Sequence, residues 1–170
     1  MVLSTLQTAG ILMGIIYYIF IMRNQQRTRN LTLKAQELTL ETRQAQIFTQ
    51  LMDKYLTKDG LEYQRVEDGA TWSSYEEWLE IYQNDAEYHD AFRWLAHLYT
   101  GIGTLLREGL LNVRLVVLVT AIAIIRDWEK YEDVIYEWRK RTNNRTLWSE
   151  WEYLYNTIMK YLQEHPELKP

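Results

Sequence analysis

The sequence has no cysteine and contains little proline or glycine. Its 170 residues include only two prolines and seven glycines. The lack of cysteine excludes disulfides, thiolate metal sites and a cysteine nucleophile. The scarcity of proline and glycine argues against a β-sandwich or a barrel, because both need many turns. Since 47% of the residues are hydrophobic, the composition also excludes a disordered tail and favours a folded domain.

Residue patterns that carry common catalytic or metal-binding chemistry are also missing. None of the three histidines, His89, His97 and His165, has the helix spacing to a carboxylate or a second histidine that a di-metal bundle needs. The hydroxyl residues lack a histidine–acid arrangement, and no glycine-rich phosphate loop is present. We therefore expect no catalytic residue, metal or cofactor, and predict that the protein is not an enzyme.

The most prominent feature that is present is an apolar segment at the N-terminus. From Val2 to Met22 no side chain is charged, and about 20 such residues cross a bilayer. A cleaved signal peptide is disfavoured, because positive charge does not precede the apolar core and bulky residues follow it. A buried core helix is the other interpretation. The pattern predicts an uncleaved transmembrane anchor over residues 1–22, with membrane lipid as a partner.

A basic cluster follows this segment directly and consists of Arg23, Arg27, Arg29 and Lys34. Basic residues mark the cytoplasmic flank of a membrane span. We therefore expect a single-pass protein of the cell membrane, with its N-terminus outside and its C-terminal domain in the cytoplasm. The cluster should also be attracted to anionic headgroups, at about 1 kcal/mol per residue near the surface.

Charge is distributed unevenly behind the anchor. Residues 23–58 hold seven basic and three acidic residues, a balance of +4, whereas residues 59–92 hold one basic and ten acidic residues, a balance of −9. The pattern predicts a basic stalk over residues 23–58 and a separate domain over residues 59–170. Several aromatic residues fall in the acidic stretch, which argues against nucleic acid as a partner.

The spacing of apolar residues indicates helices almost throughout. In the stalk they recur in steps of three and four from Leu31 to Tyr55, which predicts an amphipathic helix that Asp59 and Gly60 end. We expect a loop from Gly60 to Thr71. Ser73 and Glu76 then form a capping box for a short helix.

Three further helices are expected in the C-terminal half. The clearest period runs from Tyr88 to Leu106 and ends at Gly109. Asn112 can cap the next helix, which is apolar nearly all round as far as Ile125 and therefore predicted to be buried. A last helix closes before Pro166. The fold class is thus all-α, with an N-terminal transmembrane helix, a helical stalk and a bundle of four to five helices.

Two groups of residues suggest association. Gly10 and Gly14 form a Gly-x-x-x-Gly pair, which lets two spanning helices approach closely and predicts a homo-oligomer. Trp78, Tyr136 and Trp148 do not fit the core patterns, and we expect them to form an exposed surface for a partner protein.

Two more glycines lie inside the predicted helix from Tyr88 to Leu106. Gly101 and Gly103 each lower helix stability by up to about 1 kcal/mol. We expect them to permit close approach of a neighbouring helix, such as the small-residue face at Thr120, Ala121 and Ala123. A kink that opens a pocket is the alternative.

Several short motifs in the C-terminal half resemble one protein family. They are Leu106–Leu111, Trp128–Lys130, Ile135, Arg139 and Trp148–Leu154. In this order they are similar to an uncharacterised prokaryotic family of small single-span membrane proteins with a C-terminal helical domain of unknown function. The similarity covers residues 88–168, about half of the chain. The resemblance implies the architecture given above and no activity.

Together these patterns predict a non-catalytic, membrane-anchored interaction module, which acts as a scaffold or accessory subunit of a membrane protein assembly. Its partners would be other membrane or cytoplasmic proteins. The alternative is a membrane-tethered enzyme or small-ligand sensor with a site inside the bundle. An open polar pocket lined by acids with perturbed pKa values or by His97 would favour that alternative.

Overall fold

The structure is a computed structural model that describes the backbone of residues 2–168 and the side chains of residues 10–168. The described residues form six α-helices and a short 3₁₀ helix, without a β-strand. The prediction of an all-α fold is therefore confirmed. The chain divides into two compact units, Met1–Arg43 and Gln44–Pro170, and each unit is described by itself.

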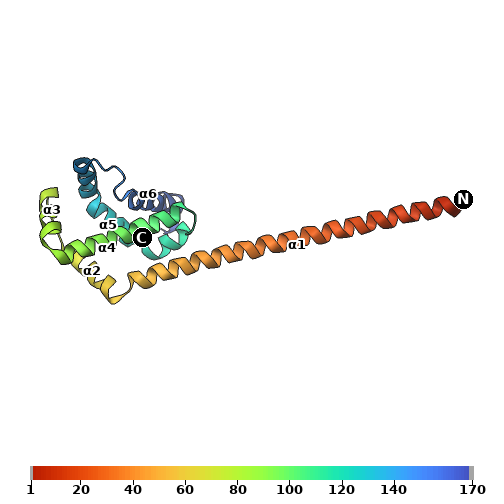
Figure 1. The fold of residues 1–170 in the computed structure, drawn as a ribbon, viewed down its shortest axis with the longest axis horizontal. Helices are drawn as coiled ribbons and strands as arrows, with labels where there is room; N and C mark the ends of the chain where they lie inside the picture. Colours follow the sequence, from red (N-terminus) through yellow and green to blue (C-terminus); the bar gives the residue numbers. More distant parts are fainter. Residues whose placement is uncertain (1, 169–170) are drawn as a thin grey trace. The chain divides into compact units, whose positions relative to one another are not determined.

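Helix α1 runs from Val2 to Tyr55 without interruption (Figure 1). It covers the predicted anchor and most of the predicted stalk, and no proline interrupts its hydrogen bonds. Among the residues that the structure describes, no helix is both long and apolar enough to cross a bilayer. The side chains of residues 1–9, which belong to the predicted anchor, lie outside the described residues, so the anchor stays a prediction.

The C-terminal end of α1, from Gln44 onward, belongs to the second unit and forms part of its core. Phe48 is buried there, and Leu51, Met52 and Tyr55 are half-buried. The apolar stripe predicted for the stalk therefore covers core only at this end.

The segment predicted as a loop is instead helix α2, Lys58–Gly69. Thr57 caps it, because its hydroxyl accepts the Gly60 N–H at 3.1 Å. A Cβ at Gly60 would lie 2.6 Å from the Tyr55 carbonyl oxygen. Gly60 thus permits close contact between consecutive helices, and the prediction that Asp59 and Gly60 end α1 is wrong, because both lie inside α2. Few apolar residues of α2 are buried, so the helix has no apolar stripe to reveal it.

Helix α3, Tyr75–Asn84, begins one residue later than predicted. Ser74 is its cap, and the Ser74 hydroxyl accepts the Glu77 N–H at 3.2 Å. The Glu77 carboxylate accepts the Ser73 N–H at 2.6 Å. The reciprocal bonds of a capping box are present, but they involve Ser73, Ser74 and Glu77 in place of the predicted pair Ser73 and Glu76.

The longest helices of the second unit are α4, Ala86–Arg107, and α5, Val113–Thr142. Asn112 caps α5 as predicted, since its side-chain oxygen accepts the Arg114 N–H at 2.8 Å. Helix α6, Ser149–Glu164, and the 3₁₀ helix Pro166–Leu168 complete the unit. Helix α4 packs against α2, α3 and α6, while α5 packs against α3 and α6.

Large aromatic side chains fill the core of this unit, and those that are almost fully buried are Trp78, Trp128, Trp151, Tyr88, Tyr99, Tyr131 and Phe92. The N-terminal half of α5 differs from its prediction. Leu118, Val119 and Ile122 are exposed on one side of this helix. The expectation that α5 is buried all round is therefore wrong, because only its opposite side packs against the bundle.

The two glycines inside α4 have different surroundings. A Cβ at Gly103 would lie 2.0 Å from the Glu150 carbonyl oxygen of α6, whereas nothing lies within 4 Å of a Cβ at Gly101. The predicted close helix contact is therefore confirmed for Gly103. Its partner is α6, and the expected small-residue face of α5 is not involved.

Candidate functional site

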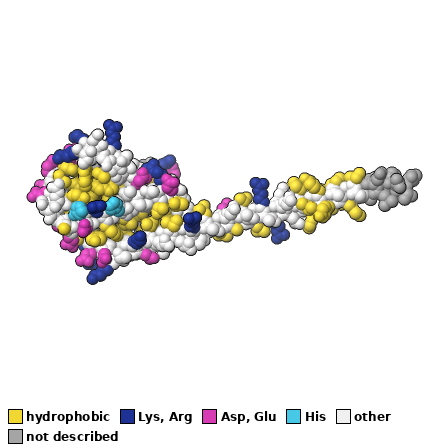
Figure 2. Space-filling view, viewed as in Figure 1, with side chains coloured by type: hydrophobic (Ala, Val, Ile, Leu, Met, Phe, Trp, Pro, Cys, Tyr) yellow, Lys and Arg dark blue, Asp and Glu magenta, His cyan; other side chains and the backbone are white. Residues whose placement is uncertain are grey.

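The predicted self-association motif lies on an open part of α1. Nothing is found within 4 Å of a Cβ built at Gly10 or Gly14. The large apolar residues that follow, from Ile11 to Phe20, are exposed on every side of the helix. Figure 2 shows these hydrophobic side chains along the part of α1 next to the grey residues. A helix surface of this kind has no apolar environment within its own unit.

The predicted basic cluster follows along the same helix. Arg23, Arg27, Arg29 and Lys34 are all exposed. Arg23, Arg27 and Lys34 are separated by four and seven residues, so they share one side of α1. Arg29 points to another side. The cluster therefore presents one basic row with a single residue outside it.

The structure separates the three aromatic residues that were expected to form one exposed surface. Trp78 is 0% exposed. It stacks on Tyr82 and donates a hydrogen bond from its indole N–H to the Tyr88 hydroxyl at 3.0 Å. Trp148 is half-buried against Phe92, and only Tyr136 is exposed. The expectation of an exposed Trp78 is wrong, because this side chain completes the aromatic core between α3 and α4.

A chain of buried polar groups connects four helices, and sequence reasoning did not identify it. It begins at Trp78 of α3 and continues through Tyr88 of α4 and Tyr131 of α5 to Glu67 of α2. The two tyrosine oxygens lie 2.8 Å apart, and the Tyr131 hydroxyl donates to the Glu67 carboxylate. An indole N–H only donates and a carboxylate only accepts. Every hydroxyl in this chain therefore donates in the direction of Glu67.

Burial governs the ionisation of this chain. Glu67 is 3% exposed, and its burial raises the pKa of its carboxyl to about 7. The hydrogen bond from Tyr131 and the positive charge of Lys130 act in the opposite direction. Burial also raises the pKa of Tyr88 and that of Tyr131. The tyrosines thus stay neutral, and Glu67 is the group that can exchange a proton near neutral pH.

Lys130 lies between Glu67 and the surface. Its amino group is 3.7 Å from a Glu67 carboxylate oxygen and donates to the Glu67 backbone carbonyl. It also lies 5.1 Å from the centre of the Trp72 ring, within the range of a cation–π interaction. Lys130 therefore provides the positive charge for the buried carboxylate.

A second buried acid lies on the same helix as Lys130. Asp127 is 2% exposed and accepts hydrogen bonds from the Tyr99 hydroxyl at 2.7 Å and from Arg126 at 2.8 Å. Arg126 also pairs with Asp68 of α2 at 3.1 Å. Both buried acids are thus bonded to groups on neighbouring helices, which is how buried charge is normally accommodated.

A surface groove of about 430 Å³ lies next to Lys130, and its lining residues are Trp72, Ser73, Ser74, Tyr75, Lys130, Asp133, Val134 and Glu137. The Glu67 carboxylate does not line this groove. The polar chain can hold a proton and fasten helices together, but its acid does not open onto the groove. His97 is likewise absent from the lining.

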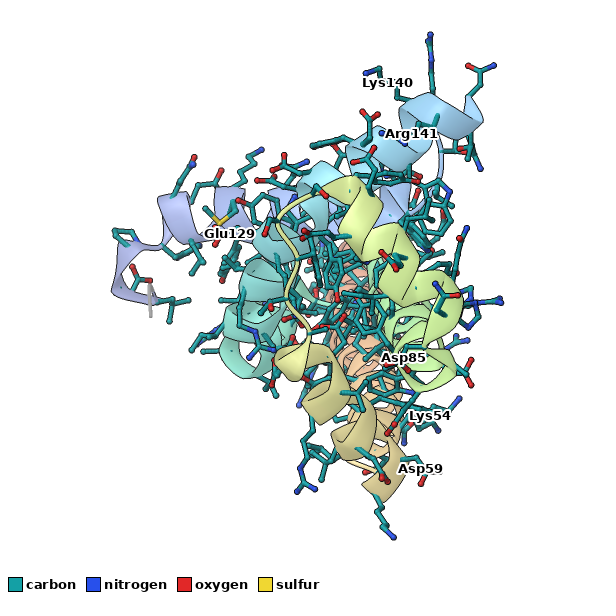
Figure 3. The ribbon with its side chains drawn as sticks, turned by 90° about the vertical axis from the view of Figure 1, so that its left-hand side faces the viewer. Lys54, Asp59, Asp85, Glu129, Lys140 and Arg141 are labelled. Atoms are coloured by element: carbon teal, nitrogen blue, oxygen red, sulfur yellow. The ribbon has the colours of Figure 1, made fainter. Side chains whose placement is uncertain are left out.

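Charged side chains outside the core lie at the periphery of the second unit. Figure 3 shows Lys140 at one end of the view and Asp59 at the other, on either side of the densely packed interior. In the described part of the chain, no group of three or more histidine, aspartate or glutamate side chains is arranged to hold a metal ion. His89 contacts Asp90 and His165 contacts Glu167, each as an exposed pair.

One signal in the sequence points to the polar chain. Tyr88 and Tyr131 both fall on apolar stripes, and a buried tyrosine hydroxyl needs a partner. Glu67 remained hidden because its segment was read as a loop, where a carboxylate is expected to be exposed.

Comparison with known proteins places the chain in a family. No curated protein matches it, and no solved structure matches it. A family model described as "Domain of unknown function (DUF4760)" matches residues 4–158, which includes most of α1 as well as the bundle. The chain therefore belongs to the DUF4760 family, whose function is not known.

Proposed function

We propose that the protein is a single-span membrane protein whose helical domain binds other proteins at the cytoplasmic surface, as a non-catalytic scaffold or accessory subunit. The observation that carries this proposal is the apolar surface of α1. Residues from Ile11 to Phe20 are exposed around the whole helix. A helix that is apolar on all sides needs an apolar environment, and hydrocarbon provides one.

The basic row supports the orientation of this anchor. Arg23 follows the apolar segment directly, at the depth where lipid headgroups begin, and Arg27 and Lys34 continue the row along the same side of α1. Basic residues at this place favour a cytoplasmic location and attract anionic lipid. The second unit would then lie on the cytoplasmic side of the membrane.

The exposed half of α5 supports a protein-binding role for the second unit. Leu118, Val119 and Ile122 form an apolar face, and Arg114 is exposed one turn before it. Contiguous exposed apolar residues often mark protein interfaces. The partner expected here offers apolar side chains flanked by an acidic residue opposite Arg114.

Alkaline carbonate extraction of membranes tests the anchor. The wild-type chain should stay with the membrane, and Leu12→Lys with Ile15→Lys should release it, since each lysine near the bilayer centre costs about 2.5–3.5 kcal/mol. The matched control is Leu33→Lys with Leu40→Lys, which changes equally exposed residues beyond the anchor. Release of the wild type, or equal behaviour of both variants, would refute the anchor.

Protease digestion of whole cells tests the orientation of the anchor. External protease should reach the C-terminal domain only after the cells are permeabilised.

The same membranes test partner binding. After mild solubilisation, Leu118→Asp with Ile122→Asp should lose the proteins that co-purify with the wild-type chain. Glu129→Asn with Asp133→Asn is the control, because both residues are exposed further along α5. Recovery of the same proteins with both variants, or of the chain alone from wild-type membranes, contradicts the scaffold function.

A further inference from the structure

One row of residues along α1 repeats with a regular heptad spacing. Steps of four and three residues alternate without exception through ten positions, which we call the seam: Gly10, Gly14, Tyr17, Ile21, Asn24, Thr28, Leu31, Ala35, Leu38 and Thr42. This is the spacing of a coiled-coil seam, and beyond the anchor its apolar members are Leu31, Ala35 and Leu38. No residue of the seam is charged.

The seam is accessible along its length. Tyr17, Leu31 and Leu38 are 66%, 59% and 63% exposed, and nothing lies near a Cβ at Gly10 or Gly14. All ten residues belong to the first unit. Within that unit the seam has no packing partner, although it continues from the predicted anchor into the stalk in one register.

Several seam residues are chemically suited to face their own copies. A side-chain amide has both donors and an acceptor, so Asn24 of one helix can hydrogen-bond with Asn24 of an identical helix. The Thr42 hydroxyl already donates to the Leu38 carbonyl at 2.8 Å, so burial of Thr42 leaves no donor unsatisfied.

The residues beside the seam also fit a parallel pair. In a parallel two-stranded coil, the residue just before an a position of the heptad faces the residue five places later on the other helix. Thr28 and Ala35 are at a positions of the seam. Arg27 then faces Thr32, and Lys34 faces Thr39. Like charges therefore do not meet across the interface at these flanking positions, and pairing of identical chains meets no repulsion there.

We propose that α1 pairs in parallel and in register with α1 of a second copy of this chain, through the seam. The inference rests on the proposed function for its direction, because two copies inserted with the same topology have parallel anchors. Gly10 and Gly14 permit close approach inside the bilayer. Leu31 and Leu38 provide apolar contacts beyond it, at heptad positions where leucine favours two strands.

Disulfide cross-linking tests this pairing directly, because the chain has no native cysteine. Leu31→Cys and Leu38→Cys, each made alone, should form cross-linked dimers on oxidation of native membranes. Leu33→Cys and Leu40→Cys are matched controls, since these leucines are 50% and 52% exposed but lie outside the seam. We expect several-fold less dimer from the controls. Equal cross-linking on and off the seam would overturn the proposal.

The same cysteine variants also report the relative direction of the two helices and the identity of the partner. One antiparallel register can bring only one of Leu31 and Leu38 opposite its own copy, so equal cross-linking at both positions requires parallel helices. Cross-links from both seam positions to a different protein, with no homodimer, would also overturn the proposal. Carbonate extraction of the same samples reports the anchor independently. Released chains that still cross-link at the seam would contradict the proposed function and leave the pairing intact.

Discussion

One buried residue of the second unit, Glu67, makes the stability of the fold depend on pH. Glu67 of α2 is buried, and its ionised form is stabilised by Tyr131 and Lys130 of α5. Burial outweighs both partners, so the carboxyl keeps its proton to higher pH than in the unfolded chain. Between the pKa of Glu67 in the unfolded chain and its higher pKa in the folded chain, the native state therefore binds more protons than the unfolded state.

The expected consequence is a loss of stability as pH rises. The pKa of Glu67 is about 7 in the folded chain and about 4.3 in an unfolded one. Its contribution is fully present below about pH 4.3 and is lost as the pH rises through 7, with a total size of about 4 kcal/mol. Glu67→Gln should remove this change from urea unfolding curves at pH 5 and pH 8. Glu62→Gln, an exposed residue of the same helix, should retain it. An unchanged pH dependence in Glu67→Gln would contradict the assignment.

At the scale of elements, the distance to the neighbouring helix determines whether a glycine in α4 is needed for close packing. Gly101 and Gly103 are two residues apart in α4, and only Gly103 meets the backbone of α6. Their sequence context predicted a close contact for both. The periodicity of one helix shows which residues face inward, but it does not show how near a neighbouring backbone comes.

Alanine substitution should therefore affect these glycines in opposite directions. Gly101→Ala should stabilise the second unit by up to about 1 kcal/mol, because alanine is the better helix former. Gly103→Ala should destabilise it by about 1–3 kcal/mol, since the new methyl group meets the Glu150 carbonyl. Urea midpoints measured by tryptophan fluorescence check both, and a stabilising Gly103→Ala would show that α4 and α6 are further apart.

Helix positions were largely predictable from the sequence, and the polar site was not. The stripe from Tyr88 to Leu106 gave α4, because its apolar residues pack on several neighbours and therefore repeat regularly. Helix α2 was missed because a helix with few buried apolar residues leaves no stripe. Glu67 was missed with it. Pairs such as Tyr131 and Glu67 are 64 residues apart in the chain, so only folding brings them together.

At the scale of the whole molecule, the second unit is expected to be stable without the first. The second unit contains the buried aromatic core, all of which lies between Phe48 and Leu162. The first unit consists of a single helix, which has no core of its own. Stability of the bundle should therefore not depend on the anchor.

Truncation checks this independence. Residues 44–170 should unfold at the same urea concentration as the full chain in detergent, with tryptophan fluorescence as the signal. Residues 56–170 are the control, because they lack the buried Phe48 and should be less stable by about 3–5 kcal/mol. A large loss of stability in residues 44–170 would show that the first unit supports the bundle.

The one-way hydrogen bonds from Trp78 to Glu67 have a consequence for the entropy of the fold. Hydroxyl chains usually admit two opposite arrangements of their hydrogens, and the mixture contributes disorder. Here the indole N–H at one end can only donate, so both tyrosine hydroxyls have a single allowed orientation. Protonation of Glu67 on its second oxygen leaves these orientations unchanged. The bundle can therefore take up or release this proton without reorganising the groups that join its helices.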